Sequence, residues 1–140
     1  MATATAGTGA NVHTANGLLN VTGGVANIGG NIIKVTNTAG STLVTSATVT
    51  LNGGTLNMTG DNLGITGGLI TNLNFQSGTL MNVNQINEGA GLTKTTAGVL
   101  TLSGTMTFTG PISLNAGTLN LQPTNPMNLN AGNVTTADGT

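Results

Sequence analysis

The 140-residue sequence predicts an all-β fold, a single-stranded parallel β-helix (β-solenoid) with about six to seven coils of roughly 20 residues. Three observations predict it. Apolar residues recur at every second position, a short glycine-led motif returns along the chain, and residues typical of helices are scarce. Thr, Gly and Asn occur 28, 23 and 20 times, and these residue types suit strands and the turns between them.

The alternation of apolar and small polar residues predicts which side chains form the core. Leu100-Thr101-Leu102 and Leu119-Asn120-Leu121 show the pattern, which places one face of a strand inward and the other outward. The residues expected in the stacked core are Leu56, Met58, Leu73, Phe75, Leu80, Leu100, Leu102, Met106, Phe108, Ile112, Leu114, Leu119 and Leu121.

A Gly-Thr-Leu motif and its variants set the expected coil length. Copies begin at Gly54, Gly78, Gly98 and Gly117, so each step is roughly 20 residues, and the first step is the longest. Such drifting steps are typical of solenoid coils, whose loops vary in length while one corner is kept. Looser copies begin at Gly24, Gly40 and Gly132.

The composition excludes several classes of protein. Charged residues make up 4% of the chain, with two Lys and no Arg, so neither a nucleic-acid partner nor a basic groove is expected. The absence of Cys and the single His exclude a structural zinc site, and no cofactor is expected. No apolar run is long enough for a transmembrane helix. The 34 Leu, Ile, Val and Phe residues and the net charge of −1 argue against a disordered chain.

Residues 91–121 resemble a known repeat. The segment starts with Gly91-Leu92-Thr93-Lys94, continues through Leu100-Thr101-Leu102-Ser103-Gly104, and ends with Asn115-Ala116-Gly117-Thr118-Leu119. This pattern resembles the autotransporter-associated β-strand repeat of bacterial passenger domains. The resemblance implies a right-handed parallel β-helix on or outside a bacterial surface. It implies no catalytic residue, because that repeat is architectural.

The few ionisable residues do not predict an enzyme. Asp61 and Glu88 are separated in the sequence by somewhat more than one expected coil, so stacking of neighbouring coils can bring them together as a carboxylate pair for glycoside cleavage. Their Gly and Asn neighbours favour solvated turns instead. The three acidic residues are too dispersed for a calcium site. The other ionisable side chains are His13, Lys34, Lys94 and Asp138.

The abundant Thr and Asn residues have two interpretations. Thr-x-Thr pairs, such as those starting at Thr48, Thr93 and Thr105, suggest an ice-binding face, but their spacing does not follow one coil period. Outward-facing Thr residues on strands are the favoured interpretation. The Asn residues are expected to stack as amide ladders between coils.

The two ends of the chain carry the functional prediction. Residues 1–16 form a polar N-terminal extension, 17–122 the solenoid and 123–140 a C-terminal segment; neither end shows a convincing cap, and almost no charge protects a strand edge. The sequence therefore predicts a structural protein that assembles with itself head-to-tail into a filament. An extracellular or cell-surface location and a bacterial origin are what the resemblance of residues 91–121 implies. An adhesin or passenger fragment that binds a surface or glycan ligand as a monomer is the alternative; an ice-binding solenoid and a tailspike-like glycan-active enzyme are more distant ones. The candidate assembly residues are Val12, Leu18, Met127, Leu129 and Val134.

Overall fold

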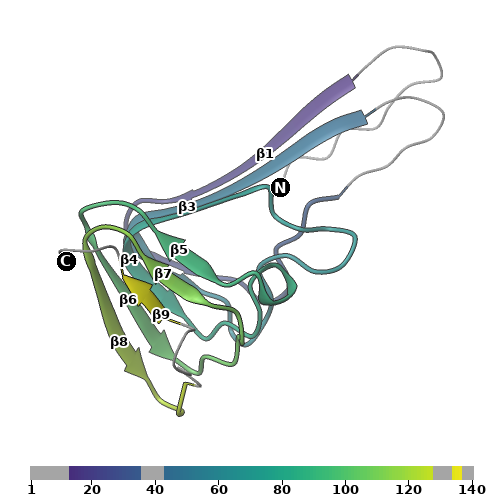
Figure 1. Cartoon of the computed structure of the whole chain (residues 1–140). Coiled ribbons are helices and arrows are strands. Elements are labelled where there is room, and N and C mark those ends of the chain that lie inside the picture. The colour runs from purple at the N-terminus through teal and green to yellow at the C-terminus, as the bar shows by residue number, and fades with distance from the viewer. Residues whose placement is uncertain (1–12, 36–42, 128–133, 137–140) are drawn as a thin grey trace.

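The computed structural model describes residues 13–35, 43–127 and 134–136, and these residues form parallel β-sheets with almost no helix (Figure 1). The larger sheet has six strands in the path β1-β3-β4-β6-β8, with β2 also paired to β3. The smaller sheet has the order β5-β7-β9. The five-stranded path ends at β1 and β8 and does not close within the described residues. This arrangement is all-β and consistent with a β-solenoid.

The strands differ in length along the chain. Their bounds are β1 (His13–Val21), β2 (Val25–Asn27), β3 (Leu43–Asn57), β4 (Asn72–Met81), β5 (Leu92–Lys94), β6 (Val99–Gly104), β7 (Ile112–Leu114), β8 (Thr118–Pro123) and β9 (Val134–Thr136). The helix found among the described residues is the short 3₁₀ turn η1 (Asn87–Gly89). In Figure 1 the long strands β1 and β3 run side by side away from the body of the molecule.

Every strand pair is parallel, and the pairing defines rows of residues that run across the sheet. One row is Ala26, Leu56, Leu80, Leu102 and Leu121, and the neighbouring row, whose side chains face outward, is Val25, Thr55, Thr79, Thr101 and Asn120. Outside the named strands, isolated parallel bridges join Ile32 to Leu63 and Leu63 to Ile86. Equivalent positions of successive segments therefore lie one above the other.

The register corrects one step of the sequence repeat. The motif spacing pairs Leu80 with Leu100, but the structure pairs Leu80 with Leu102, so this step is two residues longer than the motif predicts. A shift of two residues keeps the same side chains inward, so alternation alone does not distinguish the two registers. The steps on either side hold: Thr55 pairs with Thr79, and Leu100 with Leu119.

Val134 lies in a different sheet from the one its motif predicts. It pairs with Ile112 of β7 and does not extend the row that contains Leu119. The looser copy beginning at Gly132 is therefore out of line with the main repeat, whose glycines precede β6 and β8. The copy beginning at Gly40 lies outside the described residues.

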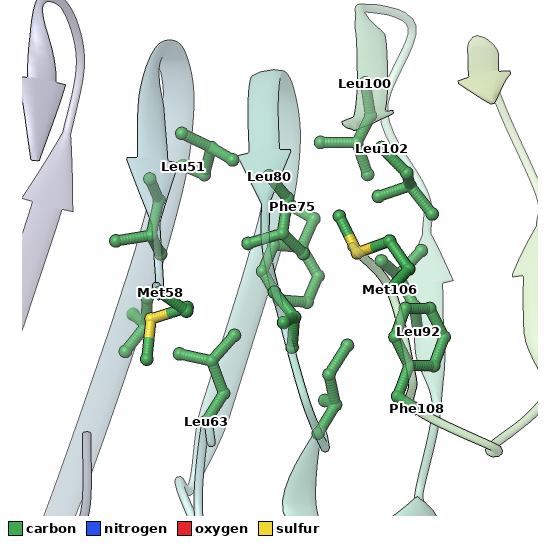
Figure 2. Packing of buried hydrophobic residues seen from close by; sticks show 14 of the residues in the cluster. Leu51, Met58, Leu63, Phe75, Leu80, Leu92, Leu100, Leu102, Met106 and Phe108 are labelled. Carbon is green, nitrogen blue, oxygen red and sulfur yellow. The ribbon is translucent and has the colours of Figure 1, made fainter. Parts of the chain in front are cut away.

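The core is a stack of aliphatic side chains with two phenylalanines. Figure 2 shows Leu51, Leu80 and Leu102 projecting from neighbouring strands into one interior. Burial of each such side chain stabilises the fold by about 1.5–3 kcal/mol. Of the residues expected in the core, those buried are Leu56, Met58, Phe75, Leu80, Leu100, Leu102, Met106, Phe108 and Ile112.

Four expected core residues lie at less covered positions. Leu73 and Leu119 are partly buried and pack against the core, and Leu114 is partly buried. The sequence places Leu121 in the core, but the structure leaves its side chain 37% exposed. Leu121 belongs to β8, the last strand of the sheet path, so no further described strand covers it.

Candidate functional site

The two ends of the six-stranded sheet are where the described strands leave edges unpaired. At one end β1 and β2 pair with β3, and at the other end β8 pairs with β6. Within the described residues, each of these three strands has one edge without a partner. Unpaired strand edges present rows of N–H and C=O groups that another chain can pair with.

The hydrogen bonds show which backbone groups point away from the sheet. At the N-terminal end, the Thr55 N–H donates to the Gly24 carbonyl (2.9 Å) and the Ile28 N–H donates to the Asn57 carbonyl (2.8 Å). Because parallel strands direct alternate residues to opposite sides, the backbone groups of Val25 and Asn27 point away from β3.

The C-terminal end has the complementary arrangement. The Thr118 N–H donates to the Gly98 carbonyl (3.2 Å) and the Thr124 N–H donates to the Gly104 carbonyl (2.9 Å). By the same alternation, Leu119 and Leu121 of β8 direct their backbone groups away from β6. Pro123 has no N–H, so pairing along this edge ends at Leu121.

An apolar hollow of about 280 Å³ opens beside β1. Leu19, Ile28 and Ile32 contribute to its wall and pack only partly buried against the core. Ala47 and Val49 of β3, together with Ile70, complete its wall, so the hollow lies between the first segment and the segments that follow it.

Asparagine ladders cross the strands, as the sequence predicts. The Asn57 amide donates to Asn27 Oδ1 (2.9 Å), and the Asn82 amide donates to Asn57 Oδ1 (2.9 Å). In a second ladder the Asn62 amide donates to Asn31 Oδ1 (2.9 Å) and the Asn84 amide to Asn62 Oδ1 (3.0 Å). All four donors point toward the N-terminal end, so each ladder has a direction.

The candidate assembly residues lie at different places. Leu18 is 64% exposed on β1. Met127 packs partly buried against the core, and Val134 pairs within the chain through β9. Val12 and Leu129 lie outside the described residues. The predicted boundary of the polar extension at Asn16 falls inside β1, which begins at His13.

Glu88 forms hydrogen bonds with Thr66, which lies in the preceding segment. Its carboxylate accepts hydrogen bonds from the N–H of Thr66 (2.6 Å) and from the Thr66 hydroxyl. Glu88 also lines a polar hollow of about 420 Å³ with Asn62, Asn84 and Thr109, and Asp61 is not part of this lining. In the described part of the chain, no three His, Cys, Asp or Glu residues are grouped as metal ligands. Asp138 lies outside that part.

The Thr-x-Thr pairs do not align with one another. Thr48 and Thr50 pair with Asn72 and Asn74 on β4, and the Asn72 amide donates to Thr48 Oγ1 (3.1 Å). Their outward side chains therefore take part in cross-strand polar contacts.

Sequence analysis did not predict the burial of Lys94. Its side chain is 0% exposed, and its Nζ donates to the Gln76 carbonyl (2.9 Å), the Thr96 carbonyl (2.5 Å) and the Thr96 hydroxyl (3.1 Å). Loss of hydration on burial lowers the pKa of Lys94 from its ordinary value of 10.5. The signal available in the sequence was the alternation, because Lys94 lies two residues after the buried Leu92.

No protein-family model, curated protein or solved structure matches this chain. Among the described residues there is no helix with the length and apolar character to span a membrane.

Proposed function

We propose that this chain is a structural subunit that assembles head-to-tail into an extracellular filament. The observation that carries the proposal is the pair of uncovered ends of one parallel sheet, each with backbone groups pointing outward. Subunits joined through two different surfaces do not close into a dimer; they propagate as a ring or an open fibre.

The proposal includes a β-solenoid architecture. The register steps become shorter along the sheet, from the pairing of Val21 with Leu51 to the pairing of Leu100 with Leu119. Because the first two steps are longer than the coil length expected from the sequence, we propose that the five strands of the path mark five coils, fewer than the six or seven expected. A right-handed coil is proposed from the resemblance of residues 91–121 to the autotransporter-associated repeat.

The charge distribution supports assembly through the ends. β1, β2 and β8 contain no Asp, Glu, Lys or Arg, the residues that monomeric β-proteins use to protect edge strands. The net charge of −1 offers little repulsion between copies. A surface or matrix fibre of bacterial cells is the location we propose, again from the resemblance.

A second candidate function is ligand binding by a single chain. It is favoured by the polar hollow that contains Glu88, Asn62 and Asn84, whose carboxylate and amides are suited to hydroxyl groups of a glycan. An adhesin of this kind would not need the sheet ends.

Negative-stain electron microscopy of the purified chain, with light scattering over a concentration series, separates the two functions. Long, unbranched filaments whose amount increases with protein concentration support the structural subunit. A chain that stays monomeric at high concentration contradicts it and makes glycan binding the function to test.

A further inference from the structure

The free edge of β2 and the free edge of β8 in a second copy have complementary backbone orientations. We infer that β8 of one copy pairs in parallel with β2 of the next, with Leu121 opposite Ala26 and Asn120 opposite Val25. This inference rests on the proposed filament. The partner is a second copy of this chain, and the contact joins unlike ends.

The backbone hydrogen bonds fix which ends meet and which residues of each strand point into the junction, and the side chains then select among registers two residues apart. Inside the chain, inward-facing residues direct their backbone groups to the next strand of the path: the N–H of the buried Met58, which directly follows β3, donates to the Met81 carbonyl at the end of β4 (2.9 Å). Outward-facing residues direct theirs to the preceding strand. At the two ends of the sheet, the backbone groups of Leu121 point toward the position of a next strand, and those of Val25 and Asn27 point toward the position of a preceding strand. A junction between β8 and β2 therefore repeats the pattern of the internal junctions, whereas two copies of the same end do not.

The side chains support the same register. The inward row runs through Ala26, Leu56, Leu80, Leu102 and Leu121. Its three middle members are 0% exposed, whereas Leu121 at the C-terminal end is 37% exposed. Stacking Leu121 on the small Ala26 of the next copy covers this leucine and continues the row across the junction.

The first asparagine ladder has the polarity that the junction requires. Its donors point toward the N-terminal end, where Asn27 Oδ1 accepts from Asn57 and the Asn27 amide N–H groups have no partner within the described residues. At the other end the ladder is continued by the Thr105 N–H, which donates to Asn82 Oδ1 (2.8 Å), and by the contact between the Thr105 and Thr124 hydroxyls (3.5 Å). In the inferred register Gln122 lies opposite Asn27, and its exposed side-chain amide oxygen is the acceptor available to the Asn27 amide.

Cysteine crosslinking tests the register, because the natural chain has no Cys. The variant Val25→Cys/Asn120→Cys places one thiol at each end of the outward row, where Val25 is exposed and Asn120 is partly exposed. Cα atoms of adjacent strands lie about 4.8 Å apart, within the range of about 4.4–6.8 Å that a disulfide spans. The matched control is Thr79→Cys/Thr101→Cys, a pair from the same row that is adjacent within one chain.

Oxidation of assembled Val25→Cys/Asn120→Cys is expected to give a ladder of covalent multimers in denaturing gels. The control pair is expected to form a bond inside one chain and to run as a monomer. Val25→Cys or Asn120→Cys alone is expected to give no covalent multimers. Dimers from either single variant show that like ends meet, which overturns the inference. Filaments without covalent multimers, while the control pair oxidises, overturn the register but leave the proposed function standing. A wild-type chain that forms no filaments overturns both.

Discussion

Substitution of Gly78 by alanine tests the stacked corner of the sheet. Gly78 has φ +104°, and a Cβ atom there would lie 2.4 Å from the Gly54 carbonyl oxygen. Gly54 is closed off in the same way, since a Cβ there would lie 2.9 Å from the backbone nitrogen of Gly23. The corner is therefore packed backbone on backbone, and only glycine fits.

Two costs follow for Gly78→Ala. An alanine at positive φ costs about 1–2 kcal/mol in backbone strain. The 2.4 Å approach forces β4 away from β3, and overpacking of this kind costs about 1–3 kcal/mol. We expect a loss of about 3 kcal/mol in the free energy of unfolding, with no relief from either side because β4 lies between β3 and β6.

Urea unfolding, at a concentration where light scattering shows monomer, measures this loss. Two matched controls separate the causes. Gly67→Ala has φ +78° and nothing within 4 Å of the new Cβ, so it reports the strain alone. Gly29→Ala has neither strain nor a close neighbour and is expected to change stability by no more than about 0.5 kcal/mol. If Gly78→Ala unfolds at the same urea concentration as Gly29→Ala, the corner is not closely stacked and the reasoning is refuted.

Three further predictions concern the interior and the ladders. Leu80→Ala is expected to cost about 2–5 kcal/mol in urea unfolding, because it leaves a cavity at a fully buried position; a loss below about 1 kcal/mol would contradict that burial. Asn57→Ala removes the hydrogen bonds to Asn27 and Asn82, so it is expected to lower the free energy of unfolding by about 1–3 kcal/mol and thereby the thermal midpoint. An unchanged midpoint would argue against the ladder. Because burial lowers the folded-state pKa of Lys94, the folded chain loses this proton before the unfolded chain does, so the free energy of unfolding should rise with pH from that lowered pKa up to about 10.5. Lys94→Met should remove the rise, and a rise that persists in this variant would assign it to another group.

The sequence allows prediction of the fold class because period-two alternation is a local property. Leu56, Leu80 and Leu102 could be assigned to the interior without knowing which strands pair. The step from Leu80 to Leu102 could not be found this way, since a shift of two residues preserves the faces and leaves the choice to loop packing. The exposure of Leu121 depends on its strand being last, which is a property of the whole stack.

The candidate site was predictable in kind but not in detail. The scarcity of charged residues near both ends of the chain predicts unprotected strand edges, yet Val25, Asn27 and Asn120 carry no chemical sign that sets them apart from other Val and Asn residues. Only the pairing partners show that their strands lie at the ends of the path. Lys94 shows the same limit, because its three oxygen acceptors come from Gln76 and Thr96 and are assembled by the fold.

Fibre diffraction from aligned filaments tests the central claim of end-to-end assembly. Strands stacked along the filament axis should give a meridional reflection at about 4.8 Å, the spacing of paired strands. If the chains instead join through their flanks, with the stacking direction across the filament, the reflection at about 4.8 Å lies on the equator and contradicts the claim.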